Sequence, residues 1–238
     1  TAPVKGIVGP WVHKYPHFAV PEPRIGFLQE ALRWWDQWLK DQDTGVMRDP
    51  AYTAYLMDGV RPQSWYEQRT GHWITEDKWP TTLTQKRWHL HPAGHLEDLP
   101  SSLHTKVSST QNCGGAAGEY CAIWLGPEMP DDQRYDDALS ACFTSGPLED
   151  RLDIIGSPTL KLKLSSDQPI AQIAVRLNHI HPDGASTRMT YGVLNLCHRN
   201  GHTVAQPLIP GEEIQISLAL DQMAYRVPTG HSVRLAIS

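Results

Sequence analysis

The second half of the chain alternates apolar and polar side chains with a period of two, and this pattern constrains the fold most. In the clearest segment, residues 159–164, all three leucines fall on one face of a strand. The signal recurs in residues 170–177, 187–197, 213–220 and 232–237. Turn motifs such as His181-Pro182-Asp183-Gly184 and Pro228-Thr229-Gly230 separate these segments. Short strands divided by such turns predict a β-sandwich of the jelly-roll type.

The first part of the chain has a different pattern. Residues 3–9 predict a short buried strand that ends at a Gly-Pro break, with His13 on the following loop. Apolar residues spaced three and four apart predict a helix over residues 25–40, packed on a core by its apolar stripe. Residues 51–58 and the stretch near 72–74 predict two more strands. The Trp79-Pro80 break is the candidate domain boundary.

Composition fits a globular chain and excludes several classes of function. Hydrophobic residues make up 40% and charged residues 20% of the 238 positions, and the net charge is -5. Without a basic run, no nucleic-acid or membrane partner is expected. No apolar stretch reaches the roughly 18–20 residues that span a bilayer. The compartment stays open, with the cytoplasm slightly favoured, and a homo-oligomer stays possible.

His13 lies where a sheet enzyme places a general base. A strand end fixes the backbone of such a histidine, and in an α/β-hydrolase the order along the chain is nucleophile, acid, histidine. Only 12 residues precede His13, and none is Asp or Glu. Its partners would therefore lie upstream of this sequence. Residues 233–238 alternate as a strand and stop without a turn, so a fragment cut at both ends is expected. The alternative is an ordinary histidine on a surface loop.

Two segments carry a specific resemblance, Gly9-Pro10-Trp11-Val12-His13 and the Trp-rich residues 25–40. They resemble the CocE/NonD hydrolases, which are cocaine-esterase-like acyl esterases related to X-Pro dipeptidyl peptidases. The likeness continues in the family's order through residues 117–121, 131–137, 152–158, 182–186 and 228–235. The family most often has Ser before the histidine, where this chain has Val12.

The resemblance implies a mainly β protein with two parts. Residues 1–80 would be the C-terminal remnant of an α/β-hydrolase domain, with its last strand, histidine loop, Trp-rich helix and linker strands. Residues 81–238 would be a jelly-roll, galactose-binding-like β-sandwich truncated at its C-terminus.

The resemblance also implies a function. The whole enzyme would be a serine hydrolase that cleaves ester or X-Pro peptide or amide bonds through a Ser-His-Asp acyl-enzyme mechanism, without a cofactor. His13 would be the triad base, and the Ser and Asp would lie upstream. The partners would be a small ester or peptide substrate and the missing N-terminal hydrolase part. The fragment alone would be inactive, and no substrate-binding residue is assigned.

Other candidate nucleophiles are weak. Gly230-His231-Ser232 half-matches a nucleophile elbow, but it opens an alternating strand. The four cysteines, at 113, 121, 142 and 197, follow no metal or redox spacing, so free thiols are favoured over disulfides. Cys121 and Cys142 have apolar neighbours, which favours buried structural thiols over nucleophiles.

No metal site is predicted, although two histidine groups are candidates. His89, His91 and His95 could close a zinc site, but a strand that leads into a turn explains them better. His179 and His181 are explained by the turn that follows them. The acidic residues 131–137 could bind calcium, although a salt-bridge network around Arg134 is favoured.

Two other classes of function stay open. The Trp residues at 65, 73, 79, 88 and 124 could form a sugar platform in a non-catalytic binding module, although inter-domain packing is favoured. The sandwich could also be a structural interface between copies of the chain.

Overall fold

A computed structural model describes residues 2–79, 83–123 and 125–238 of the chain. The longest strands, β9 (Gln172–Ile180) and β10 (Ser186–Asn195), form an antiparallel hairpin. They belong to a six-stranded sheet in the order β10-β9-β13-β6-β5-β4. The other members are β13 (Ser232–Ile237), β6 (Ala141–Thr144), β5 (His95–Glu97) and β4 (His89–His91).

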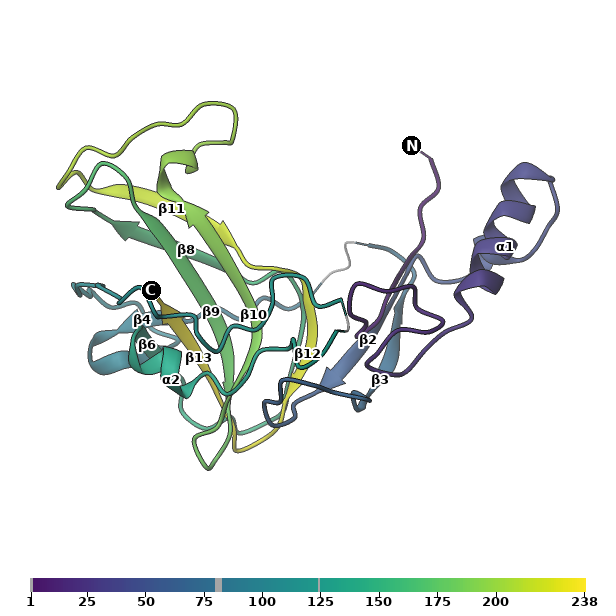
Figure 1. Cartoon of the computed structure of the whole chain (residues 1–238), viewed down its shortest axis with the longest axis horizontal. Coiled ribbons are helices and arrows are strands. Elements are labelled where there is room, and N and C mark those ends of the chain that lie inside the picture. Colours follow the sequence, from purple (N-terminus) through teal and green to yellow (C-terminus); the bar gives the residue numbers. More distant parts are fainter. Residues whose placement is uncertain (1, 80–82, 124) are drawn as a thin grey trace.

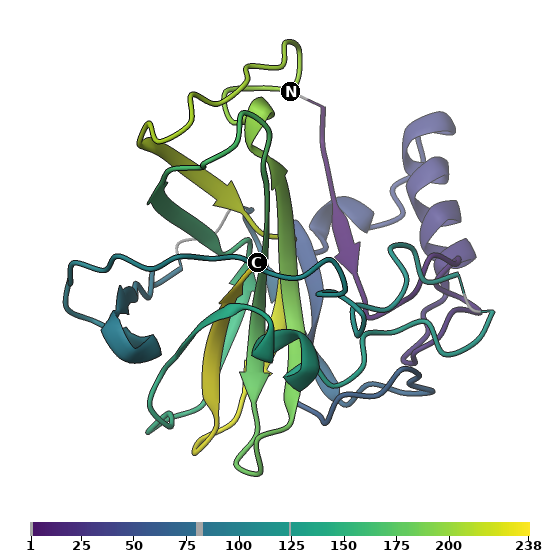
Figure 2. The same ribbon diagram turned by 60° about the vertical axis from the view of Figure 1, so that its left-hand side comes forward.

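The opposing layer is one long antiparallel pair with a bend in each strand. β8 (Thr159–Leu164) pairs with β11 (Ile214–Ala219), and β7 (Leu152–Gly156) pairs with β12 (Met223–Val227). The bend between β7 and β8 follows Gly156, whose φ of 106° lies in the region that glycine tolerates best. Figure 2 shows the β8–β11 pair crossing the long strands at an angle. The predicted jelly-roll sandwich is confirmed.

The core lies between these two layers. The alternation that predicted the strands places Val175 and Val233 of one layer, and Tyr225 and Val227 of the other, at 2% exposure or less. Burying a side chain of this kind stabilises the fold by about 1.5–3 kcal/mol. The sandwich thus holds most of the buried apolar surface of the chain.

The strand β2 (Tyr52–Asp58) joins the N-terminal part to the sandwich. β3 (Gly71–Glu76) pairs antiparallel with one edge of β2. β1 (Gly6–Val8) and β12 pair in parallel with successive parts of the other edge, so β2 touches both parts of the chain. The predicted boundary at Trp79-Pro80 stays a prediction, and Pro80 lies outside the described residues.

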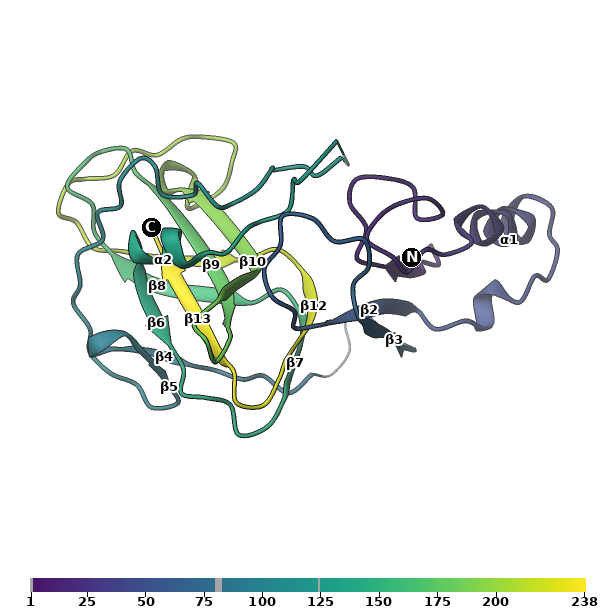
Figure 3. The same cartoon turned by 60° about the horizontal axis from the view of Figure 1, so that its bottom comes forward.

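The predicted helix is confirmed as α1 (Phe27–Leu39), but its predicted packing is wrong. No residue of α1 is buried, and the side chains of Leu28, Leu32 and Trp35 are more than half exposed. Figures 1 and 3 show α1 at the end of the molecule away from the sandwich. The apolar stripe therefore faces no core in the described part of the chain.

The prediction of a buried strand at residues 3–9 also needs correction. β1 has three residues, and Ile7 and Val8 are 43% and 49% exposed. The strand does have a neighbour in this chain, because it pairs with β2. Within the described residues its other edge is unpaired, which explains the exposure.

Four short helical segments complete the fold. The five-residue α2 (Arg134–Ala138) lies beside the six-stranded sheet. Three 3-10 turns lie in connections: η1 (Val46–Arg48) between α1 and β2, η2 (Pro92–Gly94) between β4 and β5, and η3 (Leu196–His198) after β10. Among the described residues, every helix is too short or too polar to cross a bilayer.

Candidate functional site

The loop after β1 is held by Trp11. Its indole Nε1 donates a hydrogen bond of 2.8 Å to the carbonyl of Pro23, and its ring lies 6.1 Å from that of Trp73 on β3. A Cβ atom at Gly9 would be 2.6 Å from the Trp11 ring, so the close return of the loop requires glycine there. The Gly-Pro-Trp sequence thus fixes the direction in which the chain leaves the strand.

Two backbone hydrogen bonds hold His13 after this turn. The amide of buried Val12 donates to Val20, and the amide of His13 itself donates to Ala122 at 2.8 Å. The His13 side chain is exposed. Within residues 2–79, 83–123 and 125–238 its imidazole has no hydrogen bond or ion pair. The main chain is therefore fixed while the ring stays available for contacts.

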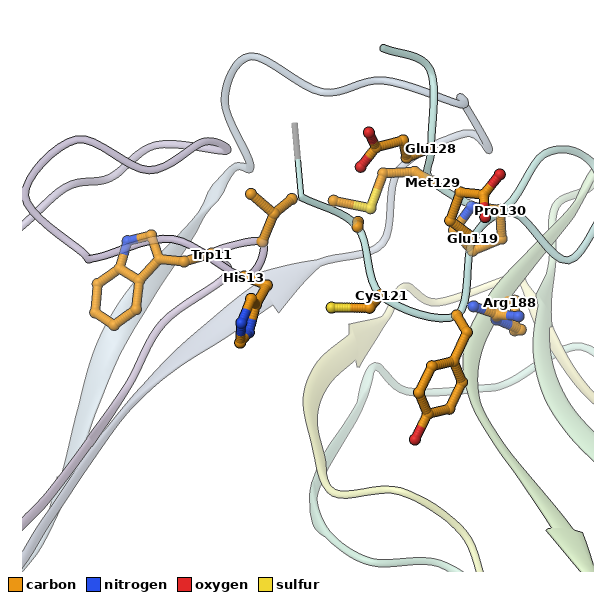
Figure 4. A pocket seen from close by; sticks show the side chains of 11 residues that line it. Trp11, His13, Glu119, Cys121, Glu128, Met129, Pro130 and Arg188 are labelled. Atoms are coloured by element: carbon orange, nitrogen blue, oxygen red, sulfur yellow. The ribbon is translucent and has the colours of Figure 1, made fainter. Parts of the chain in front are cut away.

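His13 lies on the wall of a pocket of about 460 Å³ between the N-terminal part and the sandwich. Figure 4 shows the His13 ring and the Cys121 side chain facing each other across this pocket, with Arg188 on the side of the Cys121 loop away from His13. The lining residues are Trp11, Val12, His13, Glu119, Tyr120, Cys121, Ala122, Glu128, Met129, Pro130 and Arg188. Residues 119–122, 128–130 and 188 thus form the wall opposite His13.

The loop that forms the opposite wall is held by the sandwich. The amides of Gly114 and Ala116 donate to the two carboxylate oxygens of Asp136 at 2.9 and 3.0 Å. Arg188 on β10 donates from Nη1 to the carbonyl of Ala117 at 2.8 Å. Both walls of the pocket thus depend on ordered elements.

The acidic residues 131–137 form ion pairs and hydrogen bonds. Arg134 pairs with Asp132 at 2.8 Å, as the salt-bridge interpretation predicted. The buried Asp136 and Asp137 pair instead with Arg176 on β9, at 3.3 Å each. The network therefore ties α2 to the six-stranded sheet, a partner that the sequence did not indicate.

The histidines of the first candidate metal site do not converge. His89 and His91 lie on β4, and His95 begins β5 of the same short hairpin. His91 Nε2 lies 2.5 Å from the carbonyl of Leu99, and its Nδ1 lies 3.4 Å from Glu97 Oε2. In the described ranges these three residues form no group with metal-ligand spacing.

The cysteines are free, as predicted, but their burial differs from the prediction. Cys121 is exposed on the pocket wall rather than buried. Burial raises the pKa of Cys142 to about 11, which disfavours the thiolate. Ser232 opens β13 opposite Ile180, inside a ladder and not on a nucleophile elbow.

The structure reveals a histidine cluster that the sequence did not predict. His179, His181 and His231 each place a ring nitrogen within 4.8 Å of the others. His179 lies on β9 and His181 directly follows the strand, on the same face. Their spacing of two residues already indicated this in the sequence. His231 joins them only because β13 pairs with β9, with Ser232 opposite Ile180.

Comparison with known structures identifies the fold. An aminopeptidase from a Thaumarchaeota archaeon matches 99% of this chain with a TM-score of 0.67 and 17% identity. An alpha-amino acid ester hydrolase matches 98% with a TM-score of 0.70 and 16% identity, and a CocE/NonD family hydrolase from Staphylococcus aureus matches 89% with 0.59 and 14%. This chain covers 41%, 42% and 37% of those chains, respectively. The fold is that of the C-terminal part of CocE/NonD hydrolases.

The family follows from the sequence profile of the X-Pro dipeptidyl-peptidase C-terminal non-catalytic domain, which matches residues 44–238. The chain belongs to this family. Two mycobacterial proteins have serine esterase in their names, one from Mycobacterium bovis and one from Mycobacterium tuberculosis. Each is 24% identical over 98% of this chain. The chain spans 40% of the length of these relatives.

Proposed function

We propose that the chain is the C-terminal part of a serine hydrolase that cleaves ester or X-Pro peptide bonds, with His13 as its general base. The observation that carries this proposal is the geometry of His13, whose exposed ring follows a parallel strand and a rigid Gly-Pro-Trp turn at the wall of a pocket. The matched non-catalytic domain begins at residue 44, so His13 lies upstream of it.

In this mechanism the imidazole of His13 would take the proton of a serine Oγ as that oxygen attacks the substrate carbonyl. The imidazolium would then donate the proton to the leaving alcohol or amine, and a water would release the acyl group by the same sequence. The Ser and the acid that orients the ring would come from an upstream hydrolase part. The hydrogen bond from the His13 amide to Ala122 would hold the base at a fixed distance from the sandwich wall.

Two exposed surfaces support an upstream hydrolase part as the missing partner. Among the described residues, one edge of β1 pairs with no strand, as expected where a parallel sheet continues. The apolar stripe of α1 is of the width that normally packs on such a sheet, and its leucines are more than half exposed. Both surfaces lie in the N-terminal part, close to His13 in sequence.

The 238-residue chain alone should hydrolyse p-nitrophenyl acetate no faster than its His13→Ala variant. A base without its nucleophile and acid retains only the reactivity of a free imidazole. Stopped-flow absorbance would measure both proteins at equal concentration. A burst of nitrophenolate that depends on His13 would contradict the proposal.

The substitution Leu32→Gln tests the proposed contact of α1. In the isolated chain Leu32 is 57% exposed, so the free energy of unfolding should change by less than about 0.5 kcal/mol. In the enzyme with its upstream part, we expect a loss of about 2–5 kcal/mol, since a packed leucine would be replaced. Glu30→Gln on the same helix is the control, with no difference expected between the two proteins. Equal effects of Leu32→Gln in both would refute the contact.

A further inference from the structure

The three clustered histidines occupy one end of the sandwich core. His179 is fully buried at the end of β9, His181 is 7% exposed just beyond it, and His231 lies half-buried before β13. The residues after β2 cover the cluster, because a Cβ atom at Gly59 would be 2.6 Å from the His179 ring. His231 is the most exposed member and therefore forms the opening to solvent.

The hydrogen bonds around His181 define which of its nitrogens is free. The Thr187 hydroxyl donates to the carbonyl of Val60 at 2.9 Å, so its oxygen accepts from His181 Nε2–H at 3.0 Å. The lone pair of His181 then resides on Nδ1. A ligating histidine in a metal site has this arrangement, with its second ring nitrogen donating to a polar neighbour.

His179 has the same arrangement in the tautomer whose Nδ1–H donates to the Tyr225 hydroxyl. Its Nδ1 lies 3.0 Å from the buried Tyr225 hydroxyl, and its Nε2 lies 2.6 Å from Nδ1 of His231. Three imidazole nitrogens on a tetrahedral Zn²⁺ are about 3.3 Å apart, so the last two atoms need to separate by only about 0.7 Å. With His179 Nε2 as the acceptor, the proton on His231 Nδ1 would move through solvent to His231 Nε2, and both freed nitrogens would bind the metal.

We propose that His179, His181 and His231 form a binding site for a divalent transition-metal ion of the Zn²⁺ class. The ligands would be Nε2 of His179, Nδ1 of His181 and Nδ1 of His231, with an open fourth position toward solvent. Imidazole nitrogens suit zinc, and also nickel and copper. The site is separate from the His13 pocket, whose lining includes none of the three residues.

The charge state of the cluster agrees with metal binding, which requires neutral imidazoles. Burial, together with the neighbouring imidazoles, lowers the pKa of His179 to about 3. Burial also lowers the pKa of His181 and of His231. Burial thus favours the neutral form of all three rings, which is the form that binds a metal.

Titration of the untagged, chelator-treated chain with Zn²⁺ tests the site. Calorimetry should show one Zn²⁺ per chain, and Co²⁺ should produce the intense visible absorption of a tetrahedral site. His231→Ala should weaken Zn²⁺ binding at least about 100-fold, and Thr187→Val, which removes the hydroxyl beside His181, about tenfold. The control is His202→Ala, which replaces an exposed histidine in a loop. It should change neither the Zn²⁺ affinity nor the Co²⁺ spectrum.

Two results would overturn the proposal. One is the absence of stoichiometric Zn²⁺ binding together with a weak, octahedral Co²⁺ spectrum, which would leave the cluster as a hydrogen-bonded network. The other is unchanged binding in His231→Ala, which would place the metal on exposed histidines elsewhere. If His231→Ala does not fold, the Co²⁺ spectrum of the unmodified chain and the affinity of Thr187→Val decide the question.

Discussion

Replacing His13 with alanine in the enzyme that includes the upstream hydrolase part should lower kcat for an activated ester by on the order of 10⁵–10⁶. The reason is that a serine hydroxyl is a poor nucleophile until an adjacent base removes its proton. In the isolated chain the exposed His13 ring makes no hydrogen bond within the described residues, so there the substitution should leave the stability nearly unchanged. Steady-state kinetics with a nitrophenyl ester and thermal unfolding would measure both quantities.

A second exposed histidine provides the control for this experiment. His104 is also exposed, and it does not line the pocket. His104→Ala should retain full activity. A loss of activity below tenfold in His13→Ala would rule out the role of His13 as the general base. An equal loss in both variants would point to a general effect on the protein.

Removing the carboxylate of Asp137 should strongly lower the free energy of unfolding. This 5%-exposed side chain accepts hydrogen bonds from Asn178 and Ser186 at 2.9 and 2.8 Å and pairs with Arg176 and Arg234 at 3.3 and 3.1 Å. Asp137→Ala would leave a buried guanidinium without half of its counter-charge. We expect a loss of about 3–5 kcal/mol, and a fall in Tm on the order of 10 °C.

An exposed ion pair in the same sandwich serves as the comparison. Glu213 pairs with Lys163 at 3.4 Å, and both side chains are more than 60% exposed. Glu213→Ala should change the free energy of unfolding by less than about 1 kcal/mol. Urea unfolding followed by circular dichroism would compare the two variants. If Asp137→Ala lost no more than Glu213→Ala, the buried network would not be an important source of stability.

The elements that could be predicted from sequence have a strong local signal. Residues 159–164 alternate strictly and residues 232–235 do so before an apolar end, and the structure has strands at 159–164 and 232–237. The spacing of apolar residues located α1 to within two residues at its start and one at its end. A strand or helix that buries one face has apolar residues at regular intervals in the sequence, because the burial of each residue follows from its position in the element.

Short elements that depend on tertiary contacts were missed. β5 has three residues and α2 has five, which is too few to show a period. β7 and β12 pair with each other across 70 residues of sequence, and their pairing rather than their local pattern defines them. The α1 stripe was interpreted as buried because sequence shows which face is apolar, but not which part of a protein covers it.

Only the part of the candidate site with a local sequence signal could be predicted. Gly9, Pro10 and Trp11 identified the loop of His13, because each has a local conformational role. The opposite wall around Cys121 comes from a loop more than 100 residues away, which no local pattern connects to His13. The role of His13 stays a prediction. The histidine cluster was hidden for the same reason, since His231 meets His179 only through the pairing of β13 with β9.

The position of β2 has a consequence for protein engineering. Because β2 pairs with β1 on one stretch and with β12 on the next, it is shared by the His13 segment and the sandwich. A chimera joined near residue 80 would import a sandwich without the strand that completes its sheet. Grafts that exchange this domain between hydrolases should instead carry β2 and β3 along with it, with the junction in the polar turn before η1, where the matched family domain also begins.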